Sequence, residues 1–97
     1  MATQPYQYVD GQELQLLAAI ENKRIKGKAG HCTLVGIGIT VSAYVNKHSI
    51  GKKAYKAFKR AGENDVFIVA GVLLLTEKHG FCLHVASMEK AGAIEGP

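Results

Sequence analysis

The 97-residue chain is long enough for one domain and too short for two, because domains mostly contain ~100–150 residues. Its 47% hydrophobic and 21% charged residues exclude an intrinsically disordered chain. The first five residues have no signal-peptide pattern, and the longest apolar run, 66–75, is about half of the ~20 residues that span a bilayer. We therefore predict one intracellular domain over residues 1–97, cytoplasmic or nuclear, with loose ends at about 1–5 and 91–97.

The first half of the chain is predicted to hold a short edge strand, a helix and a long strand. Residues 6–9 suit the edge strand, and Asp10 with Glu13 forms a capping box for the helix, which ends near Lys23. The apolar face of that helix consists of Leu14, Leu16, Leu17, Ala18 and Ile20. From Cys32 to Val45 apolar residues alternate with Gly, Thr and Ser, which predicts one strand, bent or bulged at a glycine.

The second half is predicted to hold a helix and a hairpin. Ser49 can cap a helix over 50–61, and Gly62 can form its C-terminal turn. Residues 66–76 form a strand that is apolar on both faces, and 77–80 turn it back into a partner strand over 81–85.

The element order is therefore (β)-α-β-α-β-β, which predicts an α+β fold with a small mixed sheet. A helix between two strands favours a right-handed parallel crossover, so both helices are placed on one face, and the C-terminal hairpin adds an antiparallel strand. A strand that is apolar on both faces is then left uncovered on one side. A second copy of the chain would cover it, so we expect a homo-oligomer, most simply a homodimer.

Positive charge is concentrated in the middle of the chain. Between Lys23 and Arg60 there are ten basic residues and no acidic ones, whereas the flanks hold two basic and all eight acidic residues. The centre carries +10 and the flanks −6, which together give the net charge of +4. The basic residues are Lys23, Arg24, Lys26, Lys28, Lys47, Lys52, Lys53, Lys56, Lys59 and Arg60.

Five of these cations lie on one arc of the helix predicted over 50–61, opposite its apolar arc. No acid offsets their repulsion, and Lys52 and Lys53 stand at the positive end of the helix dipole. This pattern favours an anionic partner, so we predict a small non-catalytic module that binds the phosphate backbone of DNA or RNA with all ten cations. An acidic protein or membrane surface as partner, and an ordinary solvated surface, are the alternatives.

The element order is similar to that of Alba-type chromatin and RNA-binding proteins. The segment from Ser49 to Ala54, Ser-Ile-Gly-Lys-Lys-Ala, resembles the start of their second helix. A nearly absent first strand and a long strand before Ser49 depart from that family, so the resemblance implies nucleic-acid binding only through the shared order of elements.

No catalytic, cofactor or metal motif is apparent. His31, Cys32, Cys82 and His84 could bind zinc, but their spacing is unlike structural zinc sites, and the predicted crossover puts the two cysteines at opposite ends of the sheet. Gly36-Ile37-Gly38 lacks the third glycine of a dinucleotide loop. We predict no catalytic residue, cofactor or metal, although an enzyme with sites between subunits is left open. Tyrosines 6, 8, 44 and 55 either stack on bases or border strands and helices.

Overall fold

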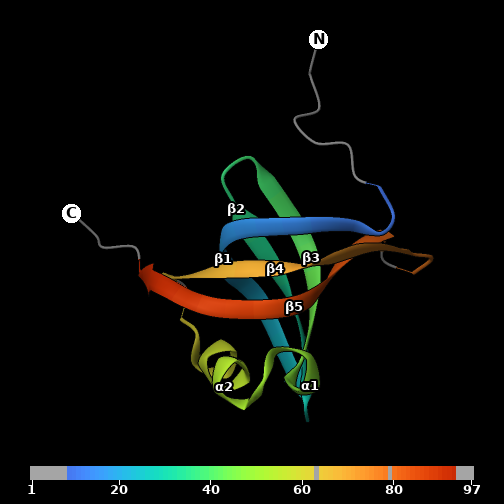
Figure 1. Ribbon diagram of the computed structural model, residues 1–97. Helices are drawn as coiled ribbons and strands as arrows, with labels where there is room; N and C mark the ends of the chain where they lie inside the picture. Colours follow the sequence, from blue (N-terminus) through green and yellow to red (C-terminus); the bar gives the residue numbers. More distant parts are fainter. Residues whose placement is uncertain (1–8, 63, 79, 94–97) are drawn as a thin grey trace.

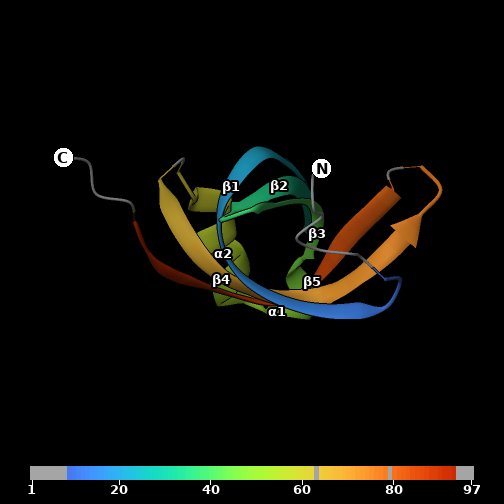
Figure 2. The same cartoon turned by 90° about the horizontal axis from the view of Figure 1, so that it is seen from above.

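The computed structural model describes residues 9–62, 64–78 and 80–93, which form a closed five-stranded barrel (Figure 1). The strands are β1 (Gln12–Lys26), β2 (Ala29–Gly36), β3 (Ile39–Asn46), β4 (Asp65–Thr76) and β5 (Gly80–Ala93). Two helices, α1 (Lys47–Ile50) and α2 (Lys52–Arg60), lie between β3 and β4. The strand order is β1-β2-β3-β5-β4, and β4 pairs again with β1. Seen from above, the strands close around a common core (Figure 2).

All strand pairs are antiparallel except β3 with β5, which pair in parallel over three residues. A Greek-key barrel of five strands is the architecture of the OB-fold. The predicted α+β fold, with a mixed sheet and both helices on one face, is therefore wrong, and so is the order of elements shared with Alba-type proteins.

The predicted first helix is instead β1, and its inward side chains explain why. The core-facing residues of β1 alternate along the strand and are Leu14, Leu16, Ala18 and Ile20. Leu17 points outward and is 56% exposed. This one outward leucine completes an apolar arc of helical width, so a strand with a period of two resembles a helix in its sequence. Asp10 caps no helix, since its Oδ1 accepts a hydrogen bond from the Leu75 N–H at 2.9 Å.

The predicted strand from Cys32 to Val45 is two strands, β2 and β3. The chain reverses between them at Ile37 and Gly38, where Ile37 is 98% exposed and Gly38 has φ 72°. The expected parallel crossover onto 66–76 is also wrong, because β4 pairs antiparallel with β1 and β5.

Two other sequence predictions are confirmed. The hairpin over 66–76 and 81–85 is β4–β5, with β5 continuing to Ala93, and α2 occupies most of the helix predicted over 50–61. The predicted cap is wrong, because Ser49 lies within α1 and the N-cap of α2 is Gly51. Most of the expected edge strand at 6–9 lies outside the described residues, and Val9 is not in a strand.

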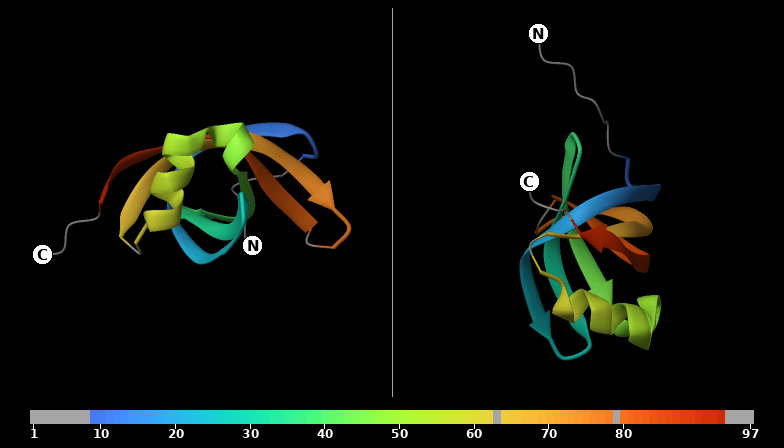
Figure 3. Two further views of the ribbon diagram at one scale, coloured as in Figure 1. Left: turned by 90° about the horizontal axis from the view of Figure 1, so that it is seen from below. Right: turned by 90° about the vertical axis from the view of Figure 1, so that its left-hand side faces the viewer.

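The helix α2 closes one end of the barrel (Figure 3). Its Phe58 is fully buried in the core with Leu34, Val45 and Phe67. Gly30 of β2 makes this packing possible, since a Cβ at that position would lie 2.8 Å from Phe58 Cε2. Tyr55 of the same helix is 3% exposed and donates its hydroxyl to the Gly27 carbonyl at 3.2 Å.

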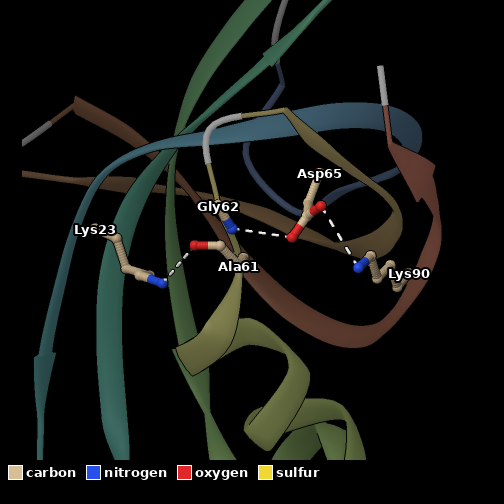
Figure 4. A network of polar contacts seen from close by, with 5 residues as sticks. All are labelled: Lys23, Ala61, Gly62, Asp65 and Lys90. Carbon is tan, nitrogen blue, oxygen red and sulfur yellow. Dashed lines mark hydrogen bonds and ion pairs between the residues drawn. The ribbon is translucent and has the colours of Figure 1, made fainter. Parts of the chain in front are cut away.

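A β-bulge in β1 joins the barrel to the C-terminal end of α2. The β1–β2 register shifts between Glu21 and Arg24, and Asn22 there has φ 51°. The Lys23 ammonium beside it donates to the carbonyls of Phe58 at 3.1 Å and Lys59 at 2.7 Å. It also donates to the Ala61 carbonyl at 2.9 Å (Figure 4). The Phe58 carbonyl also accepts from the Ala61 N–H at 3.2 Å. The Lys59 and Ala61 carbonyls lie at the end of the helix, where a cation also suits the helix dipole.

The segment after α2 is held by Asp65. Its Oδ2 accepts from the Gly62 N–H at 2.9 Å, and its Oδ1 pairs with the Lys90 ammonium at 3.5 Å (Figure 4). The Gly62 hydrogen bond first, and Lys90 second, lower the pKa of Asp65 from its ordinary value. The contribution of Asp65 to stability is therefore present at neutral pH and is lost as pH falls through that lowered pKa.

We predict that Gly30→Ala destabilises the protein by about 1–3 kcal/mol, because the added methyl group overpacks against the Phe58 ring. Gly92→Ala is the matched control, since a Cβ there meets nothing within 4 Å. Urea unfolding followed by circular dichroism measures both. Equal stability of the two variants would contradict this account of how α2 packs on β2.

Candidate functional site

A row of polar and aromatic side chains crosses the outer surface of four neighbouring strands. The register pairs Arg24 of β1 with His31 of β2, His31 with Tyr44 of β3, and Tyr44 with His84 of β5. The centroid of the Tyr44 ring lies 5.1 Å from that of His31 and 5.4 Å from that of His84. Both histidines are exposed and Tyr44 is half-buried. We call these four residues the aromatic row.

A groove lies directly beside the aromatic row. It is lined by Asn22, Arg24, His31, Cys32, Thr33, Ser42, Ala43 and Cys82. Hydroxyl, amide, guanidinium and imidazole groups therefore surround a concave surface, and the two thiols are buried in it. Such a lining offers both hydrogen-bond donors and acceptors to a flat heterocyclic ligand.

The two cysteines share this groove and do not lie at opposite ends of a sheet as expected. Burial, and after it the neighbouring Cys82, raises the pKa of the Cys32 thiol to about 12, and burial also raises the pKa of Cys82. Both are free thiols. Within the described ranges no group of three or more His, Cys, Asp and Glu side chains is placed to hold a metal ion.

The backbone behind His84 is fixed by a close approach of β4 and β5. A Cβ on Gly71 would overlap the carbonyl oxygen of His84, so only glycine permits this approach. The β4–β5 register shifts at the same place, between Ala70 and Gly71. Bulges of this kind re-aim side chains, and here the strand delivers His84 to the end of the aromatic row.

The predicted cations fall into two groups around the helix-capped end of the barrel. Arg24, Lys26 and Lys28 belong to the β1–β2 hairpin, and Lys47 lies beside them because its N–H donates to the Lys28 carbonyl at 2.8 Å. Lys23 differs from these four, since its ammonium is already engaged with three helix carbonyls. The second group is exposed on α2 and consists of Lys52, Lys53, Lys56, Lys59 and Arg60.

Sequence reasoning does not assign His31, Tyr44 and His84 to one site. They are far apart in the chain and meet only through the strand register, which a single sequence does not reveal. The sequence offers Tyr44 for base stacking and the two histidines for zinc, without bringing the three together. A signal is present in β2 and β3, where polar residues alternate with buried ones, but one long strand would show the same alternation.

No protein-family model matches the chain. A lysine–tRNA ligase of Lysinibacillus sphaericus is 33% identical over 66 residues, which are 68% of this chain and 13% of that enzyme. The lysine–tRNA ligase of Oceanobacillus iheyensis is 36% identical over 64 residues, 66% of this chain and 13% of that enzyme. The chain thus spans about 13% of the length of these curated relatives.

Solved structures show the same fold. Asparaginyl-tRNA synthetase from Pyrococcus horikoshii matches with a TM-score of 0.77 and 24% identity over 89% of this chain and 21% of that chain. Aspartyl tRNA synthetase from Entamoeba histolytica matches with a TM-score of 0.72 and 22% identity over 91% of this chain and 20% of that one. An OBody bound to hen egg-white lysozyme matches with a TM-score of 0.69 and 14% identity, covering 88% and 86% of the two chains.

We predict that Lys23→Met lowers stability by about 1–3 kcal/mol, because the Lys59 and Ala61 carbonyls at the end of α2 lose the ammonium that donates to them. The salt dependence of any nucleic-acid binding should stay unchanged, since this ammonium is engaged within the fold. Lys26→Met, at an exposed position of the same strand, should leave stability unchanged and reduce the salt dependence of binding. A reduced salt dependence in Lys23→Met would show that Lys23 belongs to the binding surface.

Proposed function

We propose that this domain binds single-stranded nucleic acid across its β1–β2–β3–β5 surface. The aromatic row supports this most directly, because bases stack on exposed rings with little regard to their sequence. The position agrees with the general use of the OB-fold, in which the face of strands 2 and 3 binds oligonucleotides and oligosaccharides. The adjoining groove supplies hydrogen-bonding groups for base edges.

The names of the relatives favour RNA as the ligand of this domain. The curated relatives are named lysine–tRNA ligases, and two of the solved structures are tRNA synthetases. The domain would bind RNA without itself performing the ligase reaction, since it spans only about 13% of those enzymes. An intracellular location is part of this proposal. No helix in the described part of the chain has the length and apolar character to cross a membrane.

The cations of the hairpin and of α2 are proposed to contact phosphates. Arg24 belongs to the aromatic row, and Lys26 and Lys28 follow it toward the helix-capped end. Lys59 lies near the β1 bulge, because the Lys23 ammonium binds its carbonyl at 2.7 Å. Cations therefore extend from the stacking surface onto the helix, which suits a polyanion that leaves the row at this end.

The fold alone does not choose between nucleic acid and protein, since one structural neighbour is an OBody bound to lysozyme. An acidic protein partner would use the cations but would gain little from the ring faces of the aromatic row. We also propose that the chain associates with copies of itself, because Ile68, Leu74 and Leu75 of β4 are exposed apolar side chains.

We predict that Tyr44→Leu weakens binding of a single-stranded RNA of ~10 nucleotides about tenfold or more, because a stacked base loses its ring partner. Tyr55→Phe is the control: it removes a hydroxyl from a buried aromatic ring that lies outside the row. Fluorescence anisotropy with labelled RNA measures both variants. Unchanged affinity of Tyr44→Leu would refute the stacking role, and equal affinity for poly-glutamate would favour the acidic-protein alternative.

We predict that replacing Lys56, Lys59 and Arg60 by Gln reduces the slope of log affinity against log salt by about 0.7–0.9 for each phosphate that the variant no longer neutralises. Stability should hold or rise slightly, since repulsion between like charges on α2 is relieved. Tyr44→Leu should lower affinity at every salt concentration without changing the slope. An unchanged slope in the triple variant would remove α2 from the binding surface.

A further inference from the structure

A second surface lies on the outside of β1 and β4, and its character differs from that of the aromatic row. Leu17 of β1 faces Ile68 of β4 in the strand register, and they are 56% and 39% exposed. Ala19 with Val66 and Gln15 with Ala70 flank this pair. Paired exposed aliphatic side chains offer neither charge nor a ring face to a nucleic acid, whereas they are typical of the centre of a protein interface.

This apolar surface continues into a groove beside α2. Ile68 and Ala70 line one side of the groove, and α1 and α2 contribute Ile50, Ala54 and Ala57. The rim carries both signs of charge: Lys52 and Lys53 come from α2, and Glu89 of β5 stands opposite Ile68 in the β4–β5 register. Lys90 of β5 also lines the groove, but its ammonium pairs with Asp65 of the same chain at 3.5 Å. Lys52, Lys53 and Glu89 are exposed.

We infer that this surface, centred on Leu17 and Ile68, binds a second copy of the chain about a two-fold axis. Glu89 would repel a uniformly acidic partner, and Lys52 and Lys53 would repel a uniformly basic one. A copy of the same surface satisfies both, because a two-fold axis lets Glu89 of each chain meet a lysine of the other. The apolar pair then lies near the axis, where it is removed from water.

This dimer leaves the aromatic row free. The strand β4 neighbours only β1 and β5 in the barrel, whereas the middle of the row is on β2 and β3. Two copies joined through β1 and β4 would therefore present two nucleic-acid surfaces in one particle. This dimer deepens the self-association proposed above and shares Lys52 and Lys53 with the cations proposed to contact phosphates. Its mass is measured without nucleic acid, so a failure of the dimer and a failure of nucleic-acid binding are distinguishable.

Light scattering coupled to gel filtration, from micromolar to millimolar protein, tests the inference. We expect the mass to rise from one chain toward two. Ile68→Glu should weaken dimerisation about tenfold or more, because it buries an unpaired charge at the interface. Ile37→Glu is the matched control, since Ile37 is an aliphatic side chain that is 98% exposed at the β2–β3 turn.

Charge reversal provides a test that leaves the apolar residues intact. Glu89→Lys and Lys53→Glu should each weaken dimerisation, and the double variant should restore it. Circular dichroism establishes that each variant is folded. A single-chain mass of the unaltered protein at every concentration would overturn the inference, as would equal weakening by Ile37→Glu or a double variant no better than the single ones.

Discussion

The bulge at Asn22 is the constraint on which both the fold and the candidate site depend. An ordinary strand alternates its side chains between two faces. If β1 kept the alternation of Ala18 and Ile20, Arg24 would point into the core and Lys23 would point outward. The extra residue breaks that alternation at the point where β1 passes the end of α2. Lys23 is thereby free to reach the helix carbonyls, and Arg24 takes its place opposite His31. The same distortion thus secures the helix and starts the aromatic row.

The molecule separates its chemistry by strand. The β2–β3 side carries rings and hydrogen-bonding groups, the helix-capped end carries cations, and the β1–β4 side carries exposed aliphatic residues. The core beneath is shared, because Leu34, Val45 and Phe67 come from three different strands around the barrel. A closed barrel can present different surfaces on a single core, since each strand has its own outward face.

Local patterns in the sequence locate α2, β4 and the final hairpin, because each is bounded by turn or capping residues and has a clear periodicity of apolar residues. They fail for β1, where Leu17 on the outer surface imitates a helical arc, and for β2 and β3, where the reversal at Gly38 resembles a bend. The concentration of cations is visible, since it is a property of composition. The aromatic row is not visible in the sequence, because the contact of Tyr44 with His84 depends on a parallel pairing between strands separated by two helices and β4.

The short pairing between β3 and β5, which we call the seam, determines where the barrel opens locally. It is the shortest strand pairing of the barrel, three residue pairs from Ser42–Cys82 to Tyr44–His84, so it holds fewer cooperative hydrogen bonds than its neighbours. Segments with few such bonds open first, well below the free energy of global unfolding. Tyr44 and His84 stand on opposite sides of this seam, and a base stacked on both would span it. A bound ligand would then hold β3 and β5 together. It would slow amide hydrogen exchange along these two strands while leaving exchange in β1 and β4 unaffected.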